Sequence, residues 1–170
     1  MATVPVVFEC SVSSAFLMDP NEHQRIGWVT KLDGFGLPVG GLRADLFPSP
    51  AELAATLQAC VARGVPVKCT AGLHHAVRHT DPATGFPHHG FLNLLTAMAA
   101  LSSGNSADCA ADWLGETDAG ALVTAVRSWS AERAARARAV FTSFGTCSVT
   151  EPVDDLVALG LLPSQERTIA

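Results

Sequence analysis

Two lysines are the residues of this sequence best placed for covalent chemistry. Lys31 and Lys68 are the only lysines, against nine arginines, and each falls late in a short apolar segment that is expected to be a strand. Removing a lysine from water favours its neutral amine, which attacks carbonyl carbon. Alternatively, each lysine pairs with a carboxylate such as Glu9 or Asp33 as a structural ion pair. The sequence leaves both interpretations open.

Five of the six histidines occur in one stretch, GLHHAVRHTDPATGFPHHG, as His74, His75, His79, His88 and His89. Imidazole transfers protons, binds substrates and metals, and makes structural hydrogen bonds. The four-residue spacing of His75 and His79, with His74 or His88 as a third ligand, would suit a metal site. That spacing matches no established zinc pattern. We therefore expect proton transfer or substrate binding here, with structural hydrogen bonding as the alternative, and no metal or cofactor.

Two further loops carry polar groups. DGFGLPVGG lacks the spacing of phosphate-binding glycine loops, and a lid or tight turn is the plainer interpretation. SFGTCSVTEP leads from a strand into a helix, where backbone N–H groups can hold an anion. Cys147 lies in this second loop, and nothing in the sequence pairs it with a base. The residues expected to contact a substrate are Arg78, as an anion clamp, His79, His88, His89, Thr70, Ser143 and Ser148.

The elements that would position these residues alternate between strand and helix. Apolar, β-branched segments predict strands at 4–10, 26–32, 65–70 and 140–147. Capping signatures predict helices that begin at Asp19 and at Ser49, the second ending at Gly64, and helical spacing predicts others at 91–101, 118–140 and 152–159. Loops are expected at 34–41 and 80–90. This order predicts a single α/β domain over residues 1–170, with parallel βα repeats and about four strands.

Four such strands would make a half-barrel or a small open sheet. A half-barrel exposes an edge and an open interior that a second copy of the chain would cover, so we expect a homodimer. Alternation along each strand places polar residues near the strand ends, where parallel α/β folds form their active sites. The sets expected to share a face are Val7, Glu9 and Ser11; Val29, Lys31 and Asp33; Pro66, Lys68 and Thr70; and Phe141, Ser143 and Gly145.

Composition argues against some partners. The net charge is −5 and no lysine or arginine run is present to neutralise phosphates, so neither nucleic acid nor an anionic membrane is expected. Charged residues make up 16% of the chain and hydrophobic residues 48%, which indicates either a buried oligomeric surface or an alanine- and valine-rich composition. Five dispersed cysteines favour reduced thiols in the cytoplasm. The segment MATVPVVFECSV fits neither a signal peptide nor a membrane span.

Three stretches resemble the C-terminal part of a widespread bacterial family that has no assigned function: VPVKCTAGLHHAVRH, TGFPHHGFLNLL and FTSFGTCSVTEPVDDLVALGLL. The likeness covers about two-thirds of the chain and implies a barrel-like fold of which this chain would be half. KLDGFGLPVGG stands where a lysine-arginine-glycine turn is expected, so no ligand role passes to that loop.

A shorter segment, ACVARGVPVKCTAG, is similar to the Schiff-base strand of deoxyribose-phosphate aldolases, which ends in K-T-S-T-G. Lys68 and Gly72 match that ending and Thr70 stands where it has the similar serine, whereas Cys69 and Ala71 depart from it. The resemblance implies carbonyl chemistry at Lys68.

These features together predict a small-molecule enzyme, a lyase or isomerase that acts on a carbonyl or anionic metabolite. Lys68 would be the reactive amine and Lys31 its neighbouring cation, while Glu9 with His74 or His75 would transfer protons. Two alternatives stay open. One is a non-catalytic or partner-dependent subunit that completes another chain's barrel, and the other is a histidine-bound metal enzyme.

Overall fold

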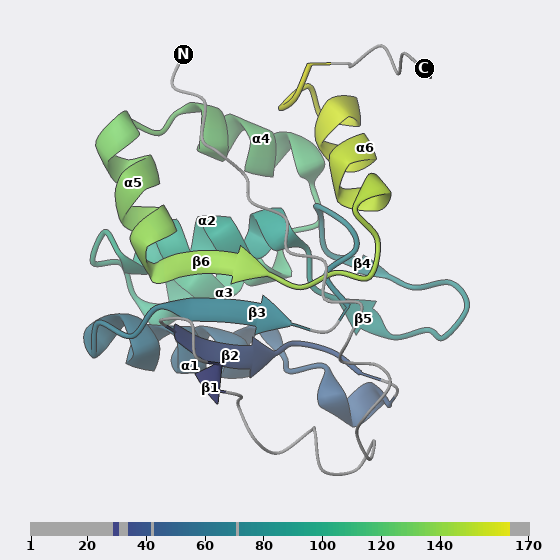
Figure 1. Cartoon of the computed structure of the whole chain (residues 1–170), viewed down its shortest axis with the longest axis horizontal. Coiled ribbons are helices and arrows are strands. Elements are labelled where there is room, and N and C mark those ends of the chain that lie inside the picture. The colour runs from purple at the N-terminus through teal and green to yellow at the C-terminus, as the bar shows by residue number, and fades with distance from the viewer. Residues whose placement is uncertain (1–28, 31–33, 42, 71, 164–170) are drawn as a thin grey trace.

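A computed structural model shows a mixed α/β fold and describes residues 29–30, 34–41, 43–70 and 72–163 (Figure 1). Its strands are β1 (Val29–Thr30), β2 (Gly34–Pro38), β3 (Val67–Thr70), β4 (His79–Thr80), β5 (Pro87–His88) and β6 (Phe141–Phe144). Its helices are α1 (Pro50–Ala62), α2 (Phe91–Leu101), α3 (Ala107–Gly115), α4 (Ala119–Arg127), α5 (Ala131–Val140) and α6 (Thr150–Ala158), with a 3-10 turn, η1, at Ala44–Leu46. The predicted α/β class is confirmed.

The main sheet has the order β1-β2-β3-β6 and is open, without closure into a barrel in the part of the chain described. β2, β3 and β6 are parallel neighbours, whereas β1 pairs antiparallel with β2. The arrows of β2, β3 and β6 point toward the side of the molecule where β4, β5 and α6 lie (Figure 1). Of the predicted strands, 65–70 contains β3, 140–147 contains the shorter β6, and 26–32 contains the short β1.

The glycine-rich segment predicted as a loop at 34–41 is instead a strand over residues 34–38. β2 pairs with β3 from Phe35 opposite Val67 to Pro38 opposite Thr70. Sheet pairing uses backbone groups, so the neighbouring strand overrides the weak strand propensity of a glycine-rich sequence. Because of this strand, β2, α1 and β3 form a βαβ unit.

Helix α1 begins as its sequence predicts. The Ser49 hydroxyl accepts a hydrogen bond from the Glu52 backbone N–H, and the Glu52 carboxylate accepts one from the Ser49 N–H at 2.9 Å. This reciprocal capping box satisfies two N–H groups that the helix leaves unpaired. The predicted end at Gly64 is also confirmed, since its φ of 64° is the left-handed value typical of a residue that terminates a helix.

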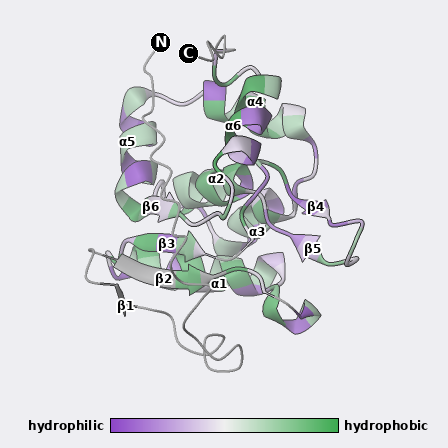
Figure 2. Ribbon diagram, turned by 45° about the vertical axis from the view of Figure 1, so that its right-hand side comes forward, coloured by the Kyte–Doolittle hydropathy of each residue, from purple (hydrophilic) through white to green (hydrophobic). Residues whose placement is uncertain are grey.

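Helix α2 is the centre of the molecule. Every residue of α2 except Leu95 is buried, and the helix contacts α1, α3, α4, α5 and β6. Its ribbon is hydrophobic over most of its length in Figure 2. A helix that is apolar all round must be surrounded, and here helices supply most of that cover. The helix predicted at 91–101 is therefore confirmed.

The single helix predicted at 118–140 is wrong, because the chain forms two helices there. α4 ends at Ser128, and α5 starts afresh at Ser130, whose hydroxyl accepts a hydrogen bond from the Arg133 N–H at 3.2 Å. Helix α3 was not predicted, although Ser106 caps it in the same manner. As a result, several helices and a hairpin separate β3 from β6, and the expected simple alternation of strand and helix does not hold between them.

The predicted loop at 80–90 contains an antiparallel hairpin of β4 and β5, with His79 opposite His88. Its turn is closed by Asp81, whose carboxylate accepts hydrogen bonds from the Ala83 N–H at 3.0 Å and the Thr84 hydroxyl at 2.7 Å. Two histidines predicted to be functional are thus held side by side by backbone pairing.

Several predictions lie outside the described residues. These are the strand at 4–10, the helix beginning at Asp19, and the candidate residues Glu9 and Lys31. Among the residues that are described, no helix is long and apolar enough to cross a membrane.

Candidate functional site

The C-terminal ends of the three parallel strands meet at one edge of the sheet. The Val39 N–H, just after β2, donates to the Thr70 carbonyl at 2.9 Å, and the Gly145 N–H, just after β6, donates to the Cys69 carbonyl at 2.8 Å. The loops that follow β3 and β6 therefore leave the sheet side by side. The candidate site is built on these loops, together with the β4–β5 hairpin and α6.

A bulge sets which face of the sheet Ser143 occupies. β6 pairs Phe141 with Val67 and Ser143 with Lys68, so Thr142 is an extra residue in the ladder. Val67 is buried, whereas Lys68 is half-buried. The predicted alternation in β6, which placed Phe141 and Ser143 together, is therefore wrong. The observed register instead sets Ser143 beside Lys68.

The loop that carries His74 and His75 is anchored by its backbone. The first N–H groups of α2, those of Phe91 and Leu92, donate to the carbonyls of His75 and Ala76 at 3.1 and 2.9 Å. Gly90 is required at this junction, because a Cβ there would overlap the Ala76 carbonyl oxygen. The two histidines are thus fixed against the N-terminal end of α2.

Two adjacent histidines face two carboxylates of α6. Nδ1 of His74 lies 2.6 Å from Oε2 of Glu151, and Nδ1 of His75 lies 3.2 Å from Oδ2 of Asp155. Glu151 and Asp155 are four residues apart and so lie on one face of the helix. Asp155 also accepts the Ala76 backbone N–H at 2.7 Å, which ties this loop to α6.

Cys147 completes a three-residue arrangement with His74. Its Sγ lies 3.2 Å from Nε2 of His74, so the imidazole ring stands between the thiol and the Glu151 carboxylate. The thiol is exposed, and the side chains of His74 and Glu151 are 28% and 46% exposed. A dissolved molecule can therefore reach the thiol.

The tautomer of a neutral His74 ring follows from its neighbours. The hydrogen bond from His74 holds the pKa of Glu151 below its usual value, so this carboxyl is ionised at neutral pH and only accepts hydrogen bonds. Nδ1 of His74 therefore carries its proton. In the neutral ring Nε2 then holds a lone pair directed at the thiol, which is how a carboxylate prepares a histidine to act as a base.

Buried His89 pairs with half-buried Arg78. His89 is 1% exposed, its Nε2 donates to the Pro48 carbonyl at 2.7 Å, and its Nδ1 accepts from the Arg78 guanidinium at 2.9 Å. Burial lowers the pKa of His89 to about 4, so the ring is neutral at pH 7. Both ring nitrogens are engaged, and this geometry gives His89 a structural role.

His79 and His88 lie in the hairpin beside this loop. The His79 ring packs edge-on against His75 at 4.8 Å between centroids and lies 5.4 Å from the ring of His88, which in turn contacts Phe47 at 4.7 Å. Burial lowers the pKa of His79, and its Nδ1 lies 3.2 Å from the Val77 carbonyl. The rings of His79, His88 and Phe47 thus form a continuous series of contacts that begins at His75.

Ser148 and Thr70 belong to the framework of the site. The Ser148 hydroxyl, just before the N-cap residue of α6, accepts a hydrogen bond from the Glu151 N–H at 3.3 Å. Thr70 is half-buried at the end of β3 and packs beside Gly145. A Cβ added at Gly145 would lie 3.7 Å from Cγ2 of Thr70. Ser148 therefore helps to orient Glu151.

Two residues of the site, Glu151 and Asp155, were missed at the sequence level, and so was the pairing of Cys147 with a base. One signal was present, since Glu151 and Asp155 have helical spacing immediately after the loop of the last strand. The partners of His74 lie 73 and 77 positions away, so no local pattern connects them.

Within the described residues, no group of three or more His, Cys, Asp or Glu side chains is arranged to hold a metal ion. No protein-family model matches the chain, and neither the curated proteins nor the solved structures include a significant match.

Proposed function

We propose that this chain is a small-molecule enzyme in which the Cys147 thiol attacks carbonyl carbon, with His74 as its base and Glu151 as the group that orients the base. The observation that carries the proposal is the imidazole of His74, placed 3.2 Å from Sγ and 2.6 Å from the carboxylate. A nucleophile, a base and an orienting acceptor in contact are the parts that nucleophilic catalysis requires.

Cys147, His74 and Glu151, together with water, account for every bond and proton in the hydrolysis of an ester, thioester or amide. Nε2 of His74 takes the thiol proton as sulfur bonds to the carbonyl carbon of an ester, thioester or amide. The imidazolium, stabilised by Glu151, then returns the proton to the leaving oxygen, sulfur or nitrogen, and a thioester remains on Cys147. Water, deprotonated by the same Nε2, adds to this thioester and releases a carboxylic acid and the thiol.

The histidine rings near Cys147 favour a polar substrate. His75, His79 and His88 lie in the neighbouring loop and hairpin, and their rings follow one another by contact. Imidazole N–H groups donate hydrogen bonds to oxygen atoms, which suits the carbonyl or anionic metabolites that the sequence predicts. The edge where parallel strands end is also where α/β folds place their sites.

The test is covalent trapping with an activated ester. We expect p-nitrophenyl acetate to leave an acetyl group on the peptide that contains Cys147, detected by mass spectrometry after a brief reaction at pH 7. Cys147→Ser should remove this label, and His74→Gln should reduce its rate about a hundredfold, as expected for loss of a general base. Cys109→Ser, which changes a half-buried cysteine on α3, is the matched control and should leave labelling unchanged.

A second candidate is the lyase or isomerase with a Schiff base on Lys68. It is favoured by the position of Lys68 in β3, between Gly36 of β2 and Ser143 of β6, two residues before the end of the strand. In this mechanism the neutral amine condenses with an aldehyde or ketone and releases water.

Borohydride separates the two candidates. Reduction in the presence of a keto acid such as pyruvate should fix an adduct on Lys68 if the Schiff base forms, and Lys68→Arg should abolish it. Acetylation of Cys147 without an adduct on Lys68 would support the thiol mechanism. The reverse result would reject the thiol mechanism and support the lysine one.

A further inference from the structure

A cleft lies on the helical side of the molecule, away from Cys147. Residues of α2, α3, α4 and α5 line it, and its volume is about 550 Å³. Its lining includes Thr96 of α2, Trp113 of α3, Asp118 at the start of α4, and Trp129 and Arg133 around the start of α5. None of them belongs to the site of Cys147.

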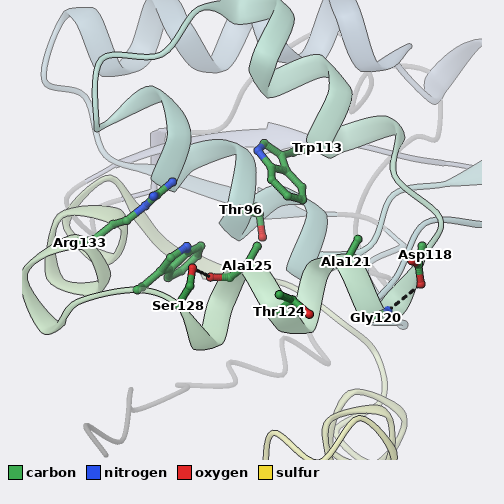
Figure 3. Close-up of a pocket in the computed structure, with 10 residues that line it drawn as sticks. Thr96, Trp113, Asp118, Gly120, Ala121, Thr124, Ala125, Ser128 and Arg133 are labelled. Atoms are coloured by element: carbon green, nitrogen blue, oxygen red, sulfur yellow. Dashed lines mark hydrogen bonds between the residues drawn. The ribbon is translucent and has the colours of Figure 1, made fainter.

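The cleft has an aromatic part and a cationic part in contact. The guanidinium carbon of Arg133 lies 5.6 Å from the centre of the Trp129 ring. The Trp113 indole projects toward the cleft from the opposite helix (Figure 3). Stacking on tryptophan suits a planar ring, and a guanidinium suits a carboxylate, so the lining has a group for each half of an aromatic acid.

Two polar atoms of the lining lack partners. Within the described residues, the Thr96 hydroxyl and Nε of Arg133 are the buried side-chain polar atoms with no hydrogen bond, and both residues line this cleft. Thr96 is 1% exposed, and its hydroxyl points toward Ala125 of α4 (Figure 3). Burying an unpaired polar group is costly, so two of them at one cleft point to a ligand that pairs with them.

Charge defines the orientation of that ligand. Asp118 and Arg133 lie at opposite ends of the cleft (Figure 3). One oxygen of Asp118 accepts the Gly120 N–H at 2.8 Å and so caps α4. An anionic group is repelled from the Asp118 end and attracted to the Arg133 end.

We propose that this cleft binds a small aromatic carboxylate, with its ring between Trp113 and Trp129 and its carboxylate on Arg133. The nearby Thr96 hydroxyl offers one more hydrogen bond after a small adjustment of the lining. This site is independent of the proposed thiol chemistry.

Benzoate is the probe, and benzamide and acetate are its controls. Two of the three tryptophans of the chain line the cleft, so binding should quench intrinsic fluorescence, and calorimetry measures the same titration without relying on fluorescence. We expect a dissociation constant of about 1 mM or below for benzoate and values at least about tenfold higher for benzamide and acetate. Cys147→Ser should bind benzoate as the native chain does.

Two variants test the residues. Arg133→Gln should weaken benzoate binding at least about tenfold, whereas Arg133→Lys keeps the charge and should retain most of it. Circular dichroism checks that each variant folds, and Arg133→Met replaces Arg133→Gln if that variant does not. Equal binding of benzoate and benzamide, binding that Arg133→Gln leaves unchanged, or no heat and no quenching with benzoate would each overturn the proposal.

Discussion

Sγ of Cys147 lies 3.2 Å from Nε2 of His74, although 73 positions separate the two residues in the chain. The parallel pairing of β3 with β6 creates this contact, because the loop after each strand leaves the sheet at the same edge. The His74 ring is held from its other side by Glu151 of α6. Reactivity at Cys147 should therefore depend on residues from two distant parts of the sequence.

Glu151→Gln should slow alkylation of Cys147 by iodoacetamide at pH 7 about tenfold, since a group that orients a functional histidine typically has an effect of this size. The amide no longer stabilises the imidazolium that forms when Nε2 takes the thiol proton. The measurement is the rate of modification of the Cys147 peptide. Glu132→Gln makes the same change on an exposed face of α5 and should leave the rate unaltered. Equal rates in all three proteins would exclude a role for Glu151.

Acid should destabilise the fold through His89. Burial lowers the pKa of this ring to about 4 in the folded chain, below the ordinary value of 6.5, so the unfolded chain binds the proton first as pH falls. The stability contributed by the neutral ring is fully present above about pH 6.5 and is lost as pH falls toward 4. We expect the free energy of unfolding to drop by about 3 kcal/mol from this ring across that interval. Urea titrations measure it, and His89→Gln should flatten this part of the pH profile.

Asn93→Leu should destabilise the fold by about 3 kcal/mol or more. The buried Asn93 side chain accepts the Arg78 N–H at 2.8 Å and donates to the carbonyls of Trp113 and Glu116 at 2.8 and 2.7 Å. Leucine has a similar size but leaves these backbone groups unpaired. Asn105→Leu is the control, because exposed Asn105 donates to the Ala100 carbonyl, and it should cost about 1 kcal/mol or less. Thermal and urea unfolding measure the stability of the two variants. Similar losses of unfolding free energy in Asn93→Leu and Asn105→Leu would contradict the prediction.

Light scattering should show twice the mass of one chain at micromolar concentration. In the described part of the chain, β6 is an outer strand of the main sheet and pairs with β3 alone, which leaves an edge for a second copy. A stable monomer at that concentration would contradict the predicted homodimer.

Treatment with a chelator should leave the melting temperature unchanged, and purified protein should carry no stoichiometric metal. The expectation rests on the engaged nitrogens of this region, since Nδ1 of His74 and of His75 face carboxylates and both nitrogens of His89 have partners. Elemental analysis checks it. Stoichiometric zinc or iron would instead favour a histidine-bound metal enzyme.

Local chemistry was sufficient for some segments, although it missed the Ser106 and Ser130 caps that begin α3 and α5. The Ser49–Glu52 capping box fixes the start of α1, because both of its partners lie within three residues. The apolar run at 91–101 predicts α2 with its observed bounds, because helical hydrogen bonds are made within the segment. The strand that carries Lys68 was predicted for a similar reason, from its apolar, β-branched sequence.

Pairing between distant segments was beyond the reach of local patterns. Strand β2 exists because β3 supplies the partners for its backbone, and the bulge at Thr142 follows from the register of β6 on β3. The meeting of Cys147, His74 and Glu151 depends on both the sheet and the docking of α6, which no periodicity encodes. The sequence by itself thus determined which thiol, amine, imidazole and carboxyl groups the chain offers and which of several short segments coil or extend. Tertiary structure alone decided which of those side chains touch, because contacts between segments far apart in the chain are selected by burial and backbone pairing of the whole fold.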